Sequence, residues 1–459
     1  MSQRIRFNAF QMNAGSHQSP GLWRHPRDRS HRYTDPAHWV ELARLLERGR
    51  FDGVFIADVL GVYDVYGGSA AAALRGGVQV PINDPLALVP LMAHATEHLG
   101  FGVTCAVTGE HPYPFARRLS TLDHLSGGRV GWNIVTGYLD SAARNFGQTR
   151  QLDHDERYDL ADEYLEVVYK LWEHSWQDDA VRRDCEAGVY VEPDRVRPIA
   201  HRGRHYDVPG IHLCEPSPQR TPVLYQAGTS PRGLRFAGRH AECVFVSGPA
   251  IPVIRRYVDQ VRSAVVAAGR ATSDVLIYAQ ALVLVGETDA EARSLYQELL
   301  DHIDPQAALA LLSGWTGVDF SRTPADAPIE YVDTPAGRTS LASFSAADPS
   351  RRWTVGEAAR FIGLGGRGPV LVGAPQQVAD QIEEWADTTG IDGFNLTYAL
   401  SHETMERVVG LLVPELQRRG RYATDYEAGT LRHKLFGRGP RLPAGHTART
   451  LAPGGPAAA

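Results

Sequence analysis

The stretch YQAGTSPRG, from Tyr225 to Gly233, contains the residue types of a phosphate-binding turn. An apolar run leads into Gly228, which lets a ligand approach the backbone closely, and Ser230 followed by Pro231 is typical of a helix start. The backbone N–H groups at such a start have no partner within the helix and can bind an anion. The same residues are equally compatible with an ordinary capped helix.

His154 and Tyr158 belong to a second polar segment, HDERYDLADEYLEVVYKLWEHSW. Their spacing of four residues places both side chains on one face of a predicted helix, where they can reach the same phosphate. The acidic residues Asp153, Asp155 and Glu156 are explained by the favourable interaction of negative charge with a helix N-terminus. We therefore assign no catalytic role to these carboxylates.

Further polar residues are predicted at the ends of apolar runs. Asp58 ends the run FDGVFIAD, where its carboxylate can either accept hydrogen bonds from a ligand or cap the following loop. Thr104 and residues 133–136 occupy similar positions in two later runs. Among 18 histidines we single out His17, because it lies with Trp23 in the loop NAGSHQSPGLWRHP that follows the first run.

Two common kinds of site are excluded by the motifs. No pattern of His, Cys or paired carboxylates has the spacing of metal ligands, so we predict no metal site. The segment Gly363 to Gly368 matches G-x-G-x-x-G, but it follows a helical stretch and precedes the apolar run PVLV. A dinucleotide site needs the order strand, turn, helix. We therefore interpret this segment as a loop without a bound nicotinamide cofactor.

Eight short runs of β-branched and aromatic residues are predicted as strands that alternate with amphipathic helices: residues 5–11, 51–58, 100–107, 129–136, 222–227, 242–247, 275–285 and 393–399. This alternation favours an α/β fold, either a closed TIM (β/α)8 barrel or a doubly wound open sheet. We favour the barrel, because the longest connections follow strands and would lie at the carboxyl end, where barrels build their active sites.

The expected organisation is one barrel domain, residues 1–437, with a flexible tail, 438–459, rich in Pro, Gly and Ala. Insertions near residues 59–84, 137–153 and 304–352 are predicted to lie at the carboxyl end and to act as lids. Another insertion, near residues 177–221, is predicted toward the opposite face, with a structural or oligomerisation role.

Composition limits the compartment and the partners. The 459 residues are 43% hydrophobic and 22% charged, with a net charge of -6, which argues against a nucleic-acid partner. No apolar run approaches the roughly 18 residues that a membrane helix needs. The four cysteines are far apart and suit a reducing cytosol, so we expect a cytoplasmic protein without membrane association.

Many motifs in one order resemble the FMN-dependent monooxygenases of the nitrilotriacetate, dibenzothiophene-sulfone, long-chain alkane and dimethylsulfide group, within the bacterial-luciferase-like superfamily. The resemblance covers about residues 5–436 and is carried by NAFQMN, GLWRHP, HRYTD, FDGVFIADVLGVYDVYGG, QVPINDP, ARRLSTLDHLSGGRVGWNIVT, NFG, HDERYDLADEYLEVVYKLWEHSW, LCEPSPQRTPVLYQAG and DGFNL. It implies a luciferase-like TIM barrel that takes reduced FMN from a separate NAD(P)H:flavin reductase. Through a C4a-peroxyflavin, such an enzyme uses O2 to oxidise a small, mainly apolar substrate, such as an organosulfur compound.

The resemblance also implies roles for individual residues. The residues expected to bind FMN are Phe10, Asp58, Thr104, Val135, Thr136, His154, Tyr158, Ala227, Gly228 and Ser230. The expected catalytic residues are His17, Tyr63 and Tyr138, with Trp23 and Gln79 in the substrate pocket. Gly137 departs from the family pattern, in which a serine commonly follows the threonine, and this removes one possible hydroxyl contact to the flavin.

Two other functions fit the same predicted barrel. One is hydride transfer with a deazaflavin, which needs neither O2 nor a reductase, and the other is storage of flavin without catalysis. The resemblance favours the monooxygenase, and by analogy it implies a homodimer or homotetramer.

Overall fold

In the computed structural model, residues 4–330, 342, 344–345 and 351–451 are described. Eight parallel strands form the barrel: β1 (Arg6–Met12), β2 (Gly53–Ala57), β3 (Gly100–Ala106), β4 (Val130–Val135), β9 (Val223–Ala227), β10 (Cys243–Val246), β11 (Leu276–Val285) and β13 (Gly393–Thr397). Each strand pairs with its neighbours, and the barrel closes because β1 pairs with β13 and β10 with β11. The predicted TIM barrel is confirmed, and each predicted strand overlaps an observed one.

A ninth strand, β12 (Val370–Gly373), was not predicted. It pairs with the second half of β11, whose ten residues continue beyond the barrel. The register joins Leu282 to Val370 and Val285 to Gly373. The sequence obscured this strand because it has only four residues and directly follows a glycine-rich loop.

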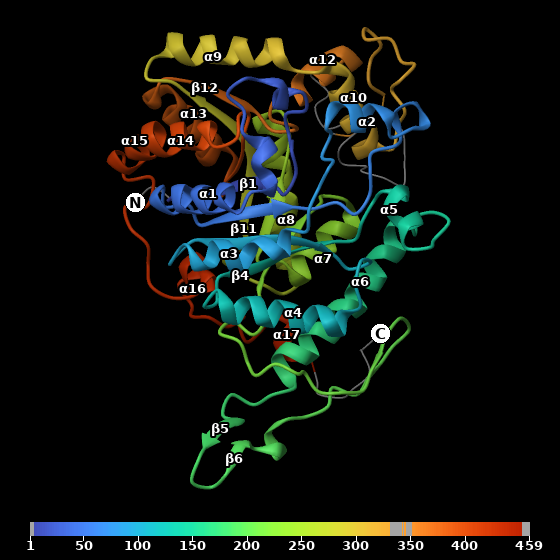
Figure 1. Cartoon of the computed structure of the whole chain (residues 1–459), viewed down its shortest axis with the longest axis vertical. Helices are drawn as coiled ribbons and strands as arrows, with labels where there is room; N and C mark the ends of the chain where they lie inside the picture. Colours follow the sequence, from blue (N-terminus) through green and yellow to red (C-terminus); the bar gives the residue numbers. More distant parts are fainter. Residues whose placement is uncertain (1–3, 331–341, 343, 346–350, 452–459) are drawn as a thin grey trace.

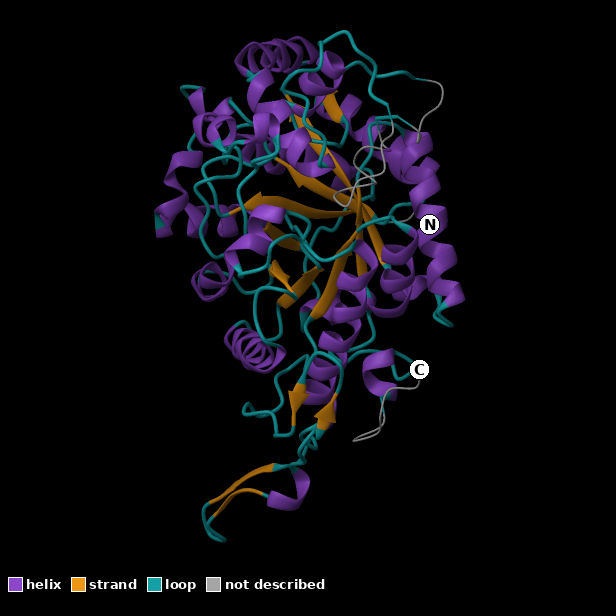
Figure 2. Ribbon diagram, turned by 90° about the vertical axis from the view of Figure 1, so that its right-hand side faces the viewer, coloured by secondary structure: helices purple, strands orange, loops and turns teal. Residues whose placement is uncertain are grey.

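Helices surround the barrel (Figures 1 and 2), among them α1 (Pro36–Arg48), α3 (Leu88–His94), α4 (Pro112–Leu125), α6 (His154–Tyr169), α7 (Pro231–His240), α8 (Ile251–Ala267), α9 (Asp289–His302) and α13 (Pro375–Thr389). Helix α1 illustrates how local sequence sets a boundary. Asp35 accepts a hydrogen bond from the Ala37 N–H at 2.9 Å, and Pro36 occupies the first helical position. The other α-helices of the described residues are α2 (Ala71–Gly76), α5 (Asp140–Asn145), α10 (Pro305–Thr316), α12 (Val355–Ile362), α14 (Glu403–Arg407), α15 (Val413–Arg418), α16 (Leu431–Phe436) and α17 (Thr447–Thr450).

The insertions after β2 and after α9 pack against each other in a second hydrophobic core, which we call the lid core. It contains Tyr63 from the loop after β2 and buried residues of α2, α10 and α12, including Leu311, Trp315 and Ile362. Gly314 in α10 permits the closest approach, because a Cβ atom there would lie 2.0 Å from the Tyr63 ring. Residues 331–341, 343 and 346–350 of the predicted 304–352 lid lie outside the described residues.

The insertion at residues 177–221 contains two small hairpins, β5 (Val181–Asp184) with β6 (Val189–Val191) and β7 (His201–Arg202) with β8 (Asp207–Val208). Figures 1 and 2 show the first hairpin projecting well away from the barrel.

The prediction of a flexible tail from residue 438 is wrong for its described part. Leu442, His446 and Ala448 are buried, and His446 Nε2 lies 3.0 Å from the carbonyl oxygen of His240 in α7. Composition misled here because small residues pack closely as readily as they allow flexibility. Residues 452–459 lie outside the described residues.

Helix α16 covers the amino-terminal end of the barrel. Leu431 and Leu435 pack into a core with Phe55, Tyr225 and aromatic residues of neighbouring strands. Arg6 at the start of β1 donates to the Leu435 carbonyl at 2.9 Å. The interior of the barrel at its amino-terminal end is therefore filled by packed side chains. No described helix is long and apolar enough to span a membrane.

Candidate active site

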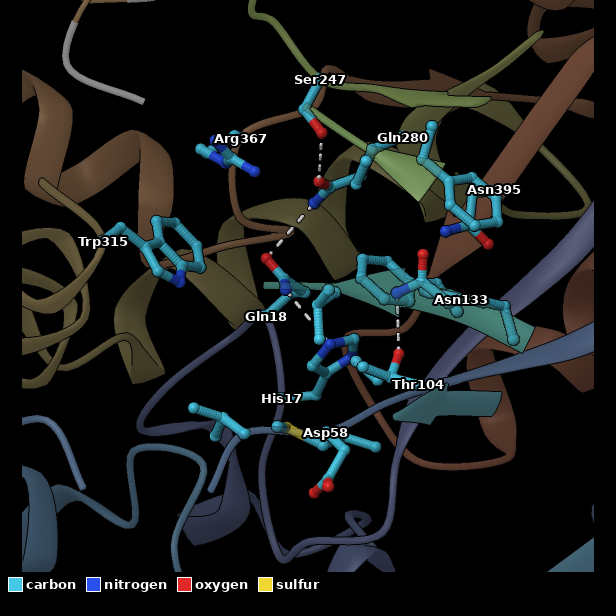
Figure 3. Close-up of a pocket in the computed structure, with 18 of the residues that line it drawn as sticks. His17, Gln18, Asp58, Thr104, Asn133, Ser247, Gln280, Trp315, Arg367 and Asn395 are labelled. Atoms are coloured by element: carbon cyan, nitrogen blue, oxygen red, sulfur yellow. Dashed lines mark hydrogen bonds between the residues drawn. The ribbon is translucent and has the colours of Figure 1, made fainter. Parts of the chain in front are cut away.

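A cavity lies at the carboxyl ends of the strands, beneath the lid core (Figure 3). Strands β1, β2, β3, β4, β9, β10, β11 and β13 all contribute residues to its wall. Ten of the predicted site residues line it: Phe10, His17, Asp58, Tyr63, Gln79, Thr104, Val135, Tyr138, Ala227 and Gly228. The structure therefore brings together residues that are up to 218 positions apart in the chain, from Phe10 to Gly228.

Gln79, Tyr63 and Tyr138 form a hydrogen-bonded chain whose direction is set by a backbone carbonyl. Gln79 Nε2 donates to the His17 carbonyl at 3.1 Å, so Gln79 Oε1 is the acceptor for the Tyr63 hydroxyl at 2.8 Å. The Tyr138 hydroxyl lies 2.8 Å from that of Tyr63 and donates to it, because the Tyr63 proton is already used. Burial raises the pKa of both tyrosines, so both stay protonated at neutral pH.

Burial also shifts the two titratable groups that the sequence singled out. It lowers the pKa of His17 to about 3, against a smaller opposing effect of the Phe10 backbone. It raises the pKa of Asp58 to about 6, while a hydrogen bond from the Val59 backbone acts in the opposite direction. His17 is therefore neutral at physiological pH, whereas Asp58 titrates close to it.

The predicted phosphate turn lies at one end of this cavity, which reaches Gly228 and Thr229. Gly228 has φ 139°, a backbone conformation that favours glycine. Ser230 caps α7 by accepting a hydrogen bond from the Gly233 N–H at 3.1 Å. His154 Nε2 lies 3.2 Å from Ser230 Oγ, while its Nδ1 lies 2.7 Å from Asp155.

Tyr158 completes this turn. A Cβ atom built on Gly228 would lie 3.4 Å from the Tyr158 hydroxyl, so the side chain reaches the glycine turn from α6. Arg232 lies over the Tyr158 ring, but its guanidinium is held by Asp159 and Asp162 at 2.9 and 2.6 Å. The predicted convergence of His154, Tyr158 and Ser230 is thus present, with the arginine directed to α6.

Five predicted site residues are not among those that line the cavity: His154, Tyr158 and Ser230, which meet at the turn just described, and Trp23 and Thr136. Trp23 is 46% exposed, and its indole N–H donates to the Gly76 carbonyl at 2.9 Å, so the ring lies on the outside of its loop. Its prediction in the substrate pocket is therefore wrong. Thr136 follows the last residue of β4 and is not among the lining residues, although Val135 is. The adjacent Gly137 has φ 74°, which explains a glycine in place of the expected serine.

Several lining residues were not predicted: Gln18, Phe245, Ser247, Gln280, Trp315, Arg367 and Asn395. Asn133 also lines the cavity, at the strand end where the sequence placed polar residues 133–136. Arg367 comes from the loop that matched G-x-G-x-x-G, and its guanidinium lies 5.2 Å from the centre of the Trp315 ring. Figure 3 shows this pair on the opposite side of the pocket from Asn395. The usable signal was the glycine density of this loop, which indicates close backbone packing whether or not a dinucleotide binds.

A family model described as "Luciferase-like monooxygenase" matches residues 16–393. The chain is 50% identical to dimethyl-sulfide monooxygenase of Hyphomicrobium sulfonivorans, over 95% of this chain and 91% of the relative. It is 47% identical to long-chain alkane monooxygenase of Geobacillus thermodenitrificans, over 98% of both chains.

Solved structures agree with these relatives. The crystal structure of the Hyphomicrobium sulfonivorans protein superposes with a TM-score of 0.91, covering 97% of this chain and 95% of that one. A riboflavin lyase solved with modified FMN and riboflavin is 36% identical and has a TM-score of 0.91, with coverage of 97% and 99%. The expected enzyme class, a monooxygenase, is confirmed by the family match. The chain belongs to the luciferase-like monooxygenase family.

Proposed function

We propose that this protein is the oxygenating component of a two-component system. It binds reduced FMN supplied by a separate NAD(P)H:flavin reductase and uses O2 to oxidise a small, mainly apolar molecule, such as an organosulfur compound. The observation that carries the proposal is one continuous cavity with a phosphate turn at Gly228 and Thr229 and an aromatic, lid-covered region at Tyr63, Tyr138 and Trp315. A flavin and a second small molecule would need these two environments together.

The residues around the cavity fit the parts of FMN. Ser230 and His154 would hold the phosphate at the start of α7, where free backbone N–H groups attract negative charge. Phe10, Val135 and Ala227 offer apolar wall for the ring. Asn133 Oδ1 is buried and has no hydrogen-bond partner among the described residues, so it provides an acceptor for an N–H group of the ring.

The relatives support both the cofactor and the substrate class. The two relatives above are named after dimethyl sulfide and long-chain alkanes, which are small or apolar molecules. The riboflavin lyase was solved with a modified FMN. When bound, reduced FMN supplies the electrons that activate O2. The protein's own contribution is to exclude water with the lid core and to hold polar groups in fixed orientations around the reacting atoms.

The proposal is tested by anaerobic titration of the purified protein with reduced FMN and, separately, with reduced deazaflavin. The complex is then mixed with isotopically labelled O2 and a panel of sulfides, sulfones, alkanes and amines. We expect tighter binding of reduced FMN and label in one product. A preference for deazaflavin would indicate hydride transfer, and complete conversion of O2 to peroxide with every substrate would indicate a flavin carrier.

His17 is the first side chain to remove. The His17 ring lies at the cavity wall beside Phe10, with ring centroids 4.4 Å apart, where it can contact the reacting atoms. We therefore predict that His17→Ala leaves FMN binding intact but diverts O2 from product to free peroxide. The ratio of peroxide to product measures this diversion. An unchanged ratio would mean that His17 only fastens its loop.

A further inference from the structure

A chain of four polar side chains, from the half-buried Ser247 to three buried residues, ends at His17, and neither the motifs nor the family match assigned it a role. Ser247 Oγ donates to Gln280 Oε1 at 3.0 Å, and Gln280 Nε2 lies 3.3 Å from Gln18 Oε1. Gln18 Nε2 in turn lies 3.1 Å from His17 Nε2. Figure 3 shows these residues in one line across the pocket wall.

The direction of this chain is fixed at a backbone carbonyl. Gln280 Nε2 also donates to the Gly365 carbonyl at 2.8 Å, and a carbonyl oxygen can only accept. The other amide hydrogen of Gln280 is therefore directed to Gln18 Oε1, which leaves Gln18 Nε2 facing the imidazole. Because an amide nitrogen can only donate, His17 Nε2 must accept and cannot carry a proton.

The loop that matched G-x-G-x-x-G makes room for both glutamines. Gly365 and Gly366 have φ of 87° and 76°. A Cβ atom on Gly366 would lie 2.0 Å from Gln18 Oε1 and 2.7 Å from Gln280 Nε2. The Gly365 N–H donates to Ser19 Oγ at 3.0 Å, which ties the loop to the segment that carries His17. The glycines thus serve the amide chain.

We propose that Gln18 and Gln280 are positioning residues that hold His17 as the neutral tautomer protonated at Nδ1, with Nε2 as a hydrogen-bond acceptor. In this state Nε2 has no proton to give. If the proposed function holds, on which this consequence rests, His17 acts by orientation and by hydrogen bonding through Nδ1, and a proton needed during turnover comes from another group.

The surroundings of the imidazole agree with a neutral ring. Burial lowers the pKa of His17 to about 3. The Tyr398 ring is 6.3 Å away, and burial raises the pKa of Tyr398, which keeps it neutral. The other titratable groups that line the cavity are Asp58, Tyr63, Tyr138 and Arg367. None of these is among the causes of the His17 shift.

The tautomer can be measured in the protein without flavin, by long-range 1H–15N correlation spectra of the full chain labelled at histidine. His17→Gln identifies the His17 signals. We expect a protonated Nδ1 and an acceptor-type Nε2 that do not titrate between about pH 5 and 9. A wild-type spectrum with the proton on Nε2 would overturn the proposal. Only the assignment of the signals uses a variant, and the tautomer itself is read from the wild-type protein.

Two substitutions test the direction of the chain. In Gln280→Glu, a carboxylate, which can only accept, replaces the amide that donates to Gln18. The Gln18 amide should therefore turn, so that its Nε2 donates to the carboxylate and its Oε1 faces His17. His17 should then carry its proton on Nε2, and the Nδ1–H signal should be lost. In Gln280→Leu the direction is no longer set, and both tautomers are expected. The control is Gln381→Leu, because Gln381 Nε2 donates to a backbone carbonyl, of Val372 at 3.1 Å, outside the pocket.

The control should leave the His17 signals unchanged. A folded Gln280→Glu protein with the wild-type tautomer would overturn the proposal even if reduced FMN binds as expected. Conversely, a confirmed tautomer with no FMN binding would contradict only the proposed function. The two failures are therefore distinguishable.

Discussion

A buried ion pair at the amino-terminal end of the barrel and the polar side chains of the cavity at its carboxyl end differ in how fully they are hydrogen-bonded. At the amino-terminal end, Arg432 is 1% exposed, and its guanidinium donates to both oxygens of Glu242 at 2.6 and 2.8 Å. It also donates to the carbonyls of Thr221 and Pro222 at 2.9 and 3.0 Å, while Glu242 accepts from the Leu224 N–H. Every donor and acceptor of this ion pair is used within the protein.

At the carboxyl end, buried polar groups are only partly used. Asn133 Nδ2 donates to Thr104 at 2.9 Å, but Asn133 Oδ1 and Asn395 Oδ1 have no partners among the described residues. An unsatisfied buried acceptor costs about 1–3 kcal/mol, which a ligand that donates to it would recover. The difference indicates that the Arg432–Glu242 pair serves the architecture, whereas the unpaired acceptors of the cavity are available to a ligand.

The largest expected effect comes from breaking the ion pair below. Arg432→Met leaves Glu242 buried without a counter-ion and should lower the free energy of unfolding by about 3–5 kcal/mol. Urea denaturation measures this loss. Arg293→Met is the control, because Arg293 is 68% exposed and pairs with Asp289, itself 37% exposed, at the surface, where solvent screens the pair and its loss should change stability far less. Equal losses in the two variants would contradict the architectural role of the buried pair.

The next largest effect is expected from removing a helix cap at the carboxyl end of the barrel, compared with a cap at the amino-terminal end. Ser230→Ala combined with His154→Gln should weaken binding of reduced FMN by about 1.5–3 kcal/mol, as expected for lost hydrogen bonds to a charged group. Binding of reduced riboflavin, which lacks the phosphate, should change little. Calorimetry with both flavins measures the difference.

The matched control lies at the other end. Thr430 caps α16 by accepting from the His433 N–H at 3.3 Å, so Thr430→Ala should cost a similar cap stability, about 1 kcal/mol, without affecting either flavin. Equal weakening of FMN and riboflavin in the Ser230 and His154 variant would place the phosphate elsewhere.

A smaller effect is expected from overpacking the lid core. Gly314→Ala would place a methyl group 2.0 Å from the Tyr63 ring and should destabilise the protein by about 1–3 kcal/mol. Because Tyr63 must move away from Gln79 and Tyr138, free peroxide should also rise relative to product. Gly410→Ala, with no atom within 4 Å of the new Cβ, should show neither change. Destabilisation with normal coupling would separate the lid core from the chemistry.

The sequence predicted the barrel well because its signals are local. Each strand is a short run of β-branched or aromatic residues, and helix starts such as Asp35-Pro36 are set by neighbouring residues. The phosphate turn was predictable for the same reason, since Gly228, Ser230 and Pro231 are consecutive or nearly so.

The missed residues depend on tertiary packing. Gln280 lies in the middle of the apolar strand β11, and only barrel closure directs its amide to Gln18. Arg367 reaches the cavity because a glycine loop packs against β11, where a Cβ on Gly368 would lie 2.3 Å from the Gln280 carbonyl. The prediction for Trp23 was wrong because a position in an active-site loop does not determine which way a side chain points.

The smallest expected effect comes from the titration of Asp58, at the carboxyl end of the barrel. Burial raises the pKa of this carboxyl to about 6, so near neutral pH it loses its proton as pH rises. The ionised carboxylate only accepts hydrogen bonds and accepts them more strongly. Affinity for reduced riboflavin should therefore increase between about pH 5 and 7, by up to about tenfold if one charge-assisted hydrogen bond is gained.

Riboflavin is the required probe because the phosphate of FMN titrates near the same pH, as phosphate monoesters do at about 6. Asp58→Asn should bind with the same affinity across this range. For folding the sign is opposite: an acid whose folded pKa lies above its unfolded value destabilises the protein as pH rises from about 4 to 6. Asp58→Asn should therefore be relatively more stable at pH 7 than at pH 4. Riboflavin affinity that is flat with pH in the wild-type protein would remove Asp58 from the flavin site.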